Sequence, residues 1–294
     1  MSRHTSLFLI FLFILVFTGK DLLTKYLFMN ELTIFEILFF MGVGCLSIAS
    51  LEVVIKKESM LPKNARYQFF RLFVTGGAWF FATLSFKYLN AGTISIISKV
   101  NTPLMIIVAS FIGVFYTKKQ IRISYLTVVL FFVFAIWNRN PNDHFLGYLF
   151  FSIALGFVII EYIMLKDSTQ KENMYIVAAT PSISCFLIGL FGICFQESSF
   201  QALTSFTGAL LFLNGIVMYL FYRLSIYRYR ILPLGLSELP ALLASYAIIF
   251  AERTLFDIQH SVGYSLFLVL VTVLLLYIFS LRKEQRFLDK EIVS

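Results

Sequence analysis

Two polar stretches that contain proline interrupt long apolar segments, one in each half of the chain. The first reads Ser-Lys-Val-Asn-Thr-Pro from Ser98 to Pro103, and the second reads Ser-Glu-Leu-Pro from Ser237 to Pro240. Proline removes one amide donor from a helix and frees the carbonyl four residues earlier. Each stretch therefore predicts a weakened helix beside a charged side chain, with Pro103 and Pro240 as the helix breaks.

Lys99 and Glu238 are the charged side chains of these two stretches. A charge at membrane depth costs roughly 2.5–3.5 kcal/mol on insertion scales and persists when it is paired or lines a wet cavity. We predict that Lys99, Glu238 and the nearby Asn101 bind a substrate where the two helices meet near the middle of the membrane. The alternative is that Lys99 and Glu238 form a buried ion pair that only fixes the register of the helices.

Three further charged side chains lie inside apolar segments. Glu161 is a candidate to bind an amine or a proton, and the alternative is that it reaches the membrane interface. Lys20 and Asp21 are candidates for a gate in the polar half of the first segment. Because Asp21 and Lys25 are four residues apart, a local ion pair between them is the alternative that we favour.

Aromatic side chains are concentrated in two of the apolar segments. Trp79 follows the pair Gly76-Gly77, which permits close helix approach. Tyr222 occupies a corresponding segment of the second half. An aromatic ring that lines a pocket suits a cation or a nucleobase, so we include Trp79 and Tyr222 among the substrate-binding candidates. The alternative for each ring is packing between helices or contact with lipid.

The composition places most of the chain in a bilayer. Of 294 residues, 59% are hydrophobic and 14% are charged, whereas soluble domains carry roughly 25% charged residues. The net charge of +8 arises from basic residues in the gaps between apolar runs, which form no stripe, so nucleic-acid binding is not expected. The three cysteines lie inside apolar runs and the three histidines are scattered, so we predict neither a disulfide framework nor a metal site.

Ten apolar segments are long enough to cross a bilayer, which takes about 20 residues per helix. They span approximately 5–28, 34–55, 67–88, 93–115, 121–138, 145–165, 174–195, 204–226, 231–251 and 260–281. The first segment has the basic start of a signal peptide but no small-residue cleavage site, so we expect it to be retained.

The basic residues of the loops predict the orientation of these segments, because cytoplasmic loops are rich in Lys and Arg. If the N-terminus is cytoplasmic, the loops on the opposite side contain only Arg139 and Arg253. We therefore expect a multi-pass protein of the cytoplasmic (inner or plasma) membrane with both termini in the cytoplasm. Lys87 and Arg223 lie near segment ends, where we expect them to reach the interface. The basic residues on the cytoplasmic side are Arg3, Lys56, Lys57, Lys63, Arg66, Lys118, Lys119, Arg122, Lys166, Lys171, Arg228, Arg230, Arg282, Lys283, Arg286 and Lys290.

The parity of the segments predicts an internal inverted repeat. Five segments per half is an odd number, so the second half must enter the membrane from the opposite side. We predict an all-α polytopic membrane protein with ten transmembrane helices in two inverted five-helix repeats. The repeats are residues 1–143 and 144–281, and residues 282–294 form a charged cytoplasmic tail.

This pattern resembles the EamA-type ten-helix branch of the drug/metabolite transporter superfamily over nearly the whole chain. The resemblance rests on Phe86-Lys87-Tyr88 followed by Pro103, and on Glu238-Leu239-Pro240 followed by Ala251-Glu252-Arg253. The chain departs from the family at Phe115-Tyr116-Thr117, where an acidic helix exit is expected. The opening and the second half are most similar to members that take up S-adenosylmethionine. The resemblance implies that the third and eighth segments line a cavity.

These observations predict a secondary transporter that moves a small metabolite by alternating access between its halves. The chain contains no Gly-x-x-x-x-Gly-Lys-Ser/Thr phosphate loop, so we expect exchange or an ion gradient to supply the energy, and no cofactor. The expected partners are the lipid bilayer and a small-molecule substrate.

The charges leave the substrate class open. Glu238 and Glu161 with the aromatic rings favour a cationic or zwitterionic metabolite such as S-adenosylmethionine, whereas Lys99 and Arg223 favour a carboxylate or a phosphate. Amino acids or anionic metabolites are therefore the alternative, in either direction of transport. A polytopic membrane enzyme is a remote alternative, because it would need a cluster of Asp, His or Glu, and we expect no enzymatic activity. A membrane scaffold or sensor is a further remote alternative, because we see no soluble domain through which it could signal.

Overall fold

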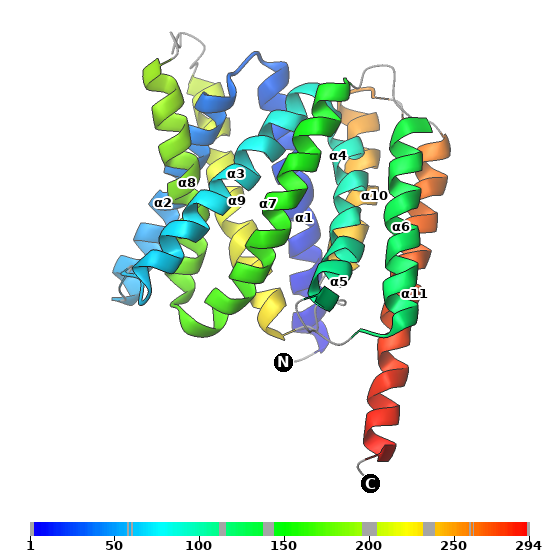
Figure 1. The fold of residues 1–294 in the computed structure, drawn as a ribbon. Coiled ribbons are helices and arrows are strands. Elements are labelled where there is room, and N and C mark those ends of the chain that lie inside the picture. Colours follow the sequence, from blue (N-terminus) through cyan, green and yellow to red (C-terminus); the bar gives the residue numbers. More distant parts are fainter. Residues whose placement is uncertain are drawn as a thin grey trace.

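The helices of this protein form a single bundle with an apolar exterior (Figure 1). The computed structural model describes residues 3–57, 59, 61–111, 116–137, 144–195, 205–231, 239–258, 260 and 262–292, and these contain no β-strand. The helices of the first half are α1 (Arg3–Met29), α2 (Ile34–Lys56), α3 (Ala65–Tyr88), α4 (Ala91–Ile97), the 3₁₀ turn η1 (Ser98–Val100), α5 (Asn101–Phe111) and α6 (Lys118–Trp137). Those of the second half are α7 (Phe145–Lys171), α8 (Met174–Phe195), α9 (Ser205–Ile231), α10 (Leu239–Leu255) and α11 (Val262–Ile292).

The lengths and surfaces of these helices are those of a membrane protein. In the described part of the chain, six segments are long and apolar enough to cross a bilayer. Large apolar side chains such as Phe73, Phe191 and Phe250 are exposed on the outside. The predicted class, an all-α polytopic membrane protein, is confirmed, whereas the count of ten spans and the inverted repeats stay predictions. The six segments are Ile34–Lys56, Ala65–Tyr88, Ala91–Val108, Phe145–Leu165, Met174–Phe195 and Phe206–Tyr227.

Glycines allow α2 and α8 to pack closely. A Cβ added at Gly42 of α2 would lie 2.4 Å from the backbone nitrogen of Phe186 on α8. A Cβ added at Gly189 of α8 would lie 2.3 Å from the backbone nitrogen of Phe39 on α2. Only glycine fits at such distances, so α2 and α8 form a tightly packed pair on one side of the bundle.

Polar side chains close several helix ends. Thr33 and Glu36 form a reciprocal capping box at the start of α2. Thr117 and Gln120 form the same pattern at the start of α6, with Gln120 N donating to Thr117 Oγ1 and Thr117 N donating to Gln120 Oε1. Gln120 Nε2 also donates to the carbonyl of Ile278 on α11. These bonds satisfy backbone amides at the helix starts that have no partner inside the helix. Such bonds are needed because hydrocarbon cannot form hydrogen bonds with these amides.

Three of the described helices contain a proline. The fourth predicted segment is not one continuous α-helix, because α4 ends at Ile97, η1 follows, and α5 begins at Asn101. Pro103 lies in the first turn of α5, where a missing amide donor is tolerated. Pro240 is the second residue of α10, and the residues before it, 232–238, lie outside the described part of the chain. A third proline, Pro181, lies inside α8.

Pro181 creates a binding partner for a buried arginine. It has no amide hydrogen to donate to the carbonyl of Val177, four residues earlier. Arg71 of α3 is fully buried, and its Nη2 donates to that carbonyl at 3.0 Å. An unmatched carbonyl on one helix thus meets a charged donor from another, which offsets part of the cost of burying the guanidinium.

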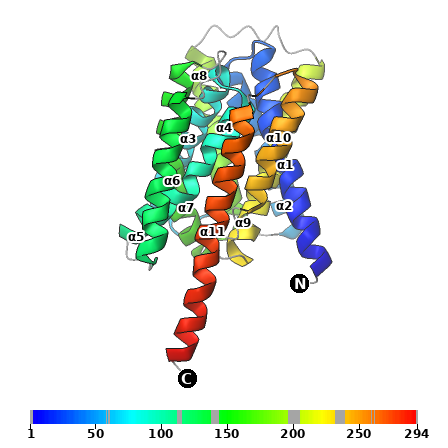
Figure 2. The same ribbon diagram turned by 90° about the vertical axis from the view of Figure 1, so that its right-hand side faces the viewer.

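Both chain termini lie at the same end of the bundle (Figures 1 and 2). The C-terminal ends of α2, α5 and α7 and the N-terminal ends of α3, α6 and α8 lie at that end as well (Figure 1). α11 extends beyond the bundle there and remains helical to Ile292, so residues 282–292 of the predicted charged tail continue a helix.

Candidate functional site

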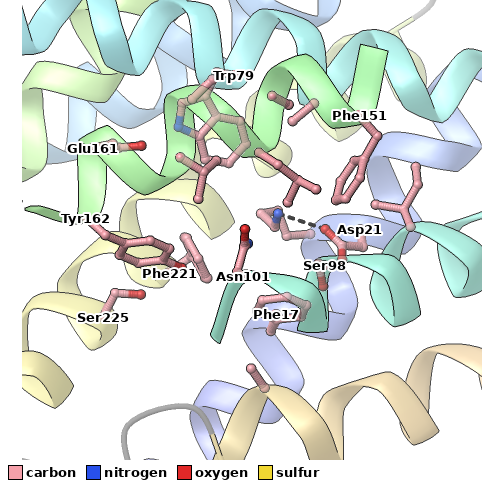
Figure 3. Close-up of a pocket in the computed structure, with 18 of the residues that line it drawn as sticks. Phe17, Asp21, Trp79, Ser98, Asn101, Phe151, Glu161, Tyr162, Phe221 and Ser225 are labelled. Carbon is pink, nitrogen blue, oxygen red and sulfur yellow. Dashed lines mark ion pairs between the residues drawn. The ribbon is translucent and has the colours of Figure 1, made fainter. Parts of the chain in front are cut away.

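A cavity of about 150 Å³ lies inside the bundle, between helices of both halves of the chain. A single water needs only roughly 10–15 Å³ on the same measure, so the space is large enough for a small solute. α1, α3, α4, η1 and α5 line it from the first half, and α7, α9 and α10 line it from the second. Its charged and aromatic lining residues, most of them shown in Figure 3, are Lys20, Asp21, Lys99, Glu161, Phe17, Trp79, Phe86, Phe151, Tyr162, Phe221 and Tyr222.

Lys20 and Asp21 of α1 form an ion pair inside this cavity, marked by the dashed line in Figure 3. Lys20 Nζ is 2.7 Å from Asp21 Oδ1. The same ammonium lies 5.3, 5.0 and 5.1 Å from the ring centroids of Phe17, Trp79 and Phe221. These distances are within the roughly 6 Å range of cation–π attraction.

The structure pairs Asp21 with Lys20 and not with Lys25, the partner that the four-residue spacing predicts. Asp21 pairs with its neighbour Lys20, while Lys25 Nζ donates to the carbonyls of Phe86 and Leu89 at 3.0 and 2.8 Å. The physical reason is that Lys25 serves the C-terminal end of α3, whose last carbonyls have no helical partner.

A chain of hydrogen bonds connects three predicted site residues across the cavity wall. Trp79 Nε1 donates to the hydroxyl oxygen of Tyr222 at 2.5 Å, and the Tyr222 hydroxyl donates to Glu161 Oε1 at 3.0 Å. Glu161 and Tyr222 are buried, with exposed fractions of 8% and 4%. Arg71 is near enough to interact electrostatically with Glu161. The Glu161 carboxylate is therefore held by a hydroxyl on one side and has a positive charge nearby.

The interruption at η1 places polar groups from the fourth segment against the cavity. Ser98, Lys99 and Asn101 all line it. Lys99 is buried, and its Nζ lies 5.0 Å from the centroid of Phe17, so this ring interacts with two ammonium groups. Asn101 Oδ1 is a buried oxygen without a protein partner in the described part of the chain.

Ser225 of α9 is a second lining residue with an unpartnered oxygen. Its side chain is 3% exposed, and its Oγ has no hydrogen-bond partner among the described residues. Buried hydroxyls are rarely left without a partner. The unpartnered oxygens of Asn101 and Ser225 therefore mark places where a bound solute or water would be held.

Seven of the ten predicted site residues line this one cavity: Lys20, Asp21, Trp79, Lys99, Asn101, Glu161 and Tyr222. Pro103 and Pro240 lie in the first turns of α5 and α10, next to lining residues Asn101 and Ala241. Glu238 lies outside the residues that the structure describes, and with it the predicted contact between Lys99 and Glu238. Lys87 is exposed near the end of α3, as an interfacial anchor would be.

The sequence reasoning missed several residues of the site. Phe17 and Phe221 were not distinguished from the many other phenylalanines, and Ser225 is a common residue in apolar helices. Arg71 has a signal in the sequence, because it is a charged residue inside the third predicted segment, whereas Arg66 lies at the segment end. Arg223 pairs with Glu52 of α2 at 3.0 Å, a glutamate that was also missed.

Two clusters of charged side chains lie toward the ends of the bundle. Toward the end that carries the termini, Glu52 binds Arg223, Lys56 and the hydroxyl of Tyr219. This cluster joins α2 to α9, which come from different halves of the chain.

At the opposite end, Glu252 of α10 is fully buried and accepts from the backbone amides of Ala91 and Gly92, both at 2.7 Å. His260 Nε2 lies 2.8 Å from the second oxygen of Glu252. A Cβ at Gly92 would lie only 2.6 Å from that oxygen, so a larger residue would displace the Glu252 carboxylate or the His260 ring. Like the Glu52 cluster, this one connects the two halves of the chain.

The fold and the site together define a helical membrane protein with a charged, aromatic-lined cavity between its halves. Solved structures share this fold: one, described only as a crystal structure of a protein, matches with a TM-score of 0.66 and 14% identity. The match covers 97% of this chain and 99% of the other. At this identity the likeness shows the fold alone. No protein-family model matches the chain, and no curated protein matches it.

Proposed function

We propose that this protein is a secondary transporter of the EamA-type branch of the drug/metabolite transporter superfamily. It moves a small zwitterionic or cationic metabolite through the cavity by alternating access. The observation that carries the proposal is a cavity lined by two lysines, two carboxylates and aromatic rings inside a bundle with an apolar exterior. Charged side chains persist inside membrane proteins where they line a solute pathway.

The packing of the helices supports two inverted halves. α1 packs against α9 and α10, and α7 packs against α3 and α5. α2 packs against α9, and α8 packs against α3. In the two predicted repeats, α1, α2, α3 and α5 hold the same places as α7, α8, α9 and α10. Each contact of a first-repeat helix above therefore has an equivalent contact of the corresponding second-repeat helix. A site between the repeats, with rocking of one against the other, is the arrangement such symmetry favours.

The clusters around Glu52 and Glu252 support alternating access. Each joins helices of different halves, one toward either end of the bundle, with the cavity in between. A carrier has to break contacts at one end while it keeps those at the other. Ion pairs and buried hydrogen bonds at both ends suit this task, because they can be exchanged for contacts with water when an end opens.

The chemistry of the cavity favours a zwitterion with an aromatic group. Carboxylates of Asp21 and Glu161 suit a cationic centre, and Lys99 suits a carboxylate. Trp79 and Tyr222 offer ring surfaces to a nucleobase or to a cation. S-adenosylmethionine has all three features and is our leading substrate. The sequence contains no Gly-x-x-x-x-Gly-Lys-Ser/Thr phosphate loop, which favours exchange or an ion gradient as the source of energy for transport.

The orientation that we propose places both termini in the cytoplasm of a cell whose cytoplasmic membrane holds the protein. Support comes from the basic residues near the end of the bundle that carries the termini. Lys56 and Lys57 end α2, and Lys118 and Lys119 begin α6, all at that end. Clusters of this kind remain on the cytoplasmic side during membrane insertion.

An anionic metabolite is the second candidate. Lys20 Nζ and Lys99 Nζ lie 5.3 and 5.0 Å from the centroid of the same ring, Phe17. Two ammonium groups near one ring raise the local positive potential, which attracts a carboxylate or phosphate. We propose no enzymatic step for either substrate.

The test is uptake of radiolabelled S-adenosylmethionine by the full chain in proteoliposomes. Saturable uptake by the parent protein is expected, with at least a tenfold loss in Lys99→Ala and in Glu161→Gln. Asp167→Asn is the matched control, because Asp167 lies on the same helix as Glu161 and pairs with Lys171 outside the cavity.

Two outcomes would count against the proposal. Uptake equal to that of protein-free liposomes removes S-adenosylmethionine, and competition with amino acids and anionic metabolites then tests the second candidate. Uptake that both cavity variants retain in full removes the cavity as the transport site.

A further inference from the structure

The ammonium of Lys20 contacts a carboxylate of the next residue along its own helix. Adjacent residues on an α-helix do not face each other, yet Lys20 Nζ lies 2.7 Å from the carboxylate of Asp21. Because the two side chains leave the helix in different directions, the Lys20 side chain has to bend toward Asp21 to make this contact. Three rings from three different helices lie around the ammonium at this point: Phe17 of α1, Trp79 of α3 and Phe221 of α9.

These rings with Asp21 form what we call the aromatic cage, consisting of Phe17, Trp79, Phe221 and Asp21. Centroid distances of 5.0 to 5.3 Å put all three rings in range of one cation. Aromatic cages of this kind recognise ammonium groups with methyl substituents, because the ring faces attract positive charge without needing a hydrogen-bond donor. Asp21 is 3% exposed and adds a full negative charge that bulk water barely screens.

We propose that the aromatic cage is the subsite for the cationic centre of the substrate, and that Lys20 occupies it as a tethered competitor. The class of ligand is a compact organic cation, a sulfonium or an alkylammonium. This inference rests on the proposed function in one respect, namely that the bound cation is a substrate that the protein transports. The cage and its lysine stand on geometry alone.

The competition has a consequence for affinity. A ligand can enter the cage only in the fraction of molecules in which Lys20 has moved away, so the apparent dissociation constant is raised by the reciprocal of that fraction. Replacing Lys20 by an uncharged residue of similar length removes the competitor and leaves Asp21 unpaired. Both changes strengthen the binding of an added cation.

The experiment measures binding of trimethylsulfonium to the purified full chain. The protein has two tryptophans, so in a Trp137→Phe background the emission of Trp79 reports on the cage. Lys20→Met is expected to lower the dissociation constant at least tenfold relative to the parent. Lys25→Met is the matched control: Lys25 lies on the same helix and binds carbonyls at the end of α3, and it is expected to bind as the parent does.

Lys20→Met leaves the buried carboxylate of Asp21 without its ion-pair partner, so this variant is expected to be less stable than the parent. This lower stability allows a second measurement. Trimethylsulfonium must then raise the melting temperature of Lys20→Met more than that of the parent. The double variant Lys20→Met/Asp21→Asn carries no charge at this position and is expected to bind the probe more weakly than Lys20→Met. Equal or weaker binding by Lys20→Met than by the parent overturns the inference, as does equal tightening in Lys25→Met.

Measuring transport and binding separately distinguishes the proposed transporter function from the proposed role of Lys20 in the aromatic cage. Tighter binding of trimethylsulfonium by Lys20→Met in a protein that transports no tested solute supports the cage and rejects the transporter. Uptake of S-adenosylmethionine with unchanged binding in Lys20→Met supports the transporter and rejects the competitor.

Discussion

The tight contact between α2 and α8 gives a prediction whose size can be worked from the structure. An alanine methyl at Gly42 or Gly189 would lie 2.4 or 2.3 Å from a backbone nitrogen of the opposing helix. Carbon atoms in contact prefer about 3.5–4.0 Å, so the two helices must separate by roughly 1 Å. Overpacking of this kind costs about 1–3 kcal/mol. We expect Gly42→Ala and Gly189→Ala each to lower the melting temperature by several degrees.

The cysteines of the chain supply the assay. Cys45 of α2 and Cys185 of α8 have no exposed surface, whereas Cys194 is exposed. In a Cys194→Ser background, a thiol-reactive maleimide dye labels Cys45 and Cys185 only when the packing of α2 and α8 opens. The temperature at which fluorescence rises is therefore the melting temperature of this contact.

Gly156→Ala is the matched control for these substitutions. A Cβ at Gly156 of α7 would meet nothing within 4 Å. Alanine at such an open helical site stabilises by about 0.4–1 kcal/mol, so its melting temperature should stay equal or rise. If the melting temperatures of Gly42→Ala and Gly189→Ala are no lower than that of Gly156→Ala, then α2 and α8 do not pack as closely as described.

Two further substitutions test the site. Arg71→Met leaves the buried Val177 carbonyl without its donor and is expected to destabilise the protein by about 1–3 kcal/mol. Arg66→Met, at an exposed position of the same helix, should leave the melting temperature within a degree, and equal melting of both variants would contradict the burial of Arg71. Tyr222→Phe removes the hydroxyl between Trp79 and Glu161 and should weaken substrate affinity by two- to tenfold, from about 0.5–1.5 kcal/mol per hydrogen bond; unchanged concentration dependence of uptake would contradict a role for this hydroxyl.

The class of the fold was predictable because the bilayer imposes a simple rule on the sequence. Spans must be long and apolar, and the described helices follow the predicted segments to within a few residues at most ends. The break in the fourth segment could be located near Pro103, because proline acts on its own helix. Its extent, with η1 at Ser98–Val100, depends on packing against other helices.

The grouping of charged residues around one cavity was predictable only in part. Charges are rare enough in apolar segments that Lys20, Asp21, Lys99 and Glu161 could be selected from the sequence. Their partners could not, because each is set by contacts across the bundle. The spacing alone predicts a pair of Asp21 with Lys25. In the structure Asp21 pairs with Lys20, whose ammonium lies among rings of α1, α3 and α9.

The hydrogen bond of Arg71 to the Val177 carbonyl could not be predicted from the sequence either. The carbonyl that it binds is freed by Pro181, and the two residues belong to different halves of the chain. Nothing local to either residue predicts the contact. A buried arginine and a proline inside another helix are each unfavourable alone, and the cost of both is reduced only when the fold brings them together.

The central claim is that the cavity is a pathway open in turn to either side of the membrane. Ser225 tests it most directly, because it lines the cavity, is 3% exposed, and has an oxygen without a protein partner in the described part of the chain. We would measure modification of Ser225→Cys, in the Cys194→Ser background, by a charged, membrane-impermeant methanethiosulfonate added to either side of proteoliposomes. The account predicts modification from each side, slowed by S-adenosylmethionine. A cysteine that reacts only after denaturation would contradict it.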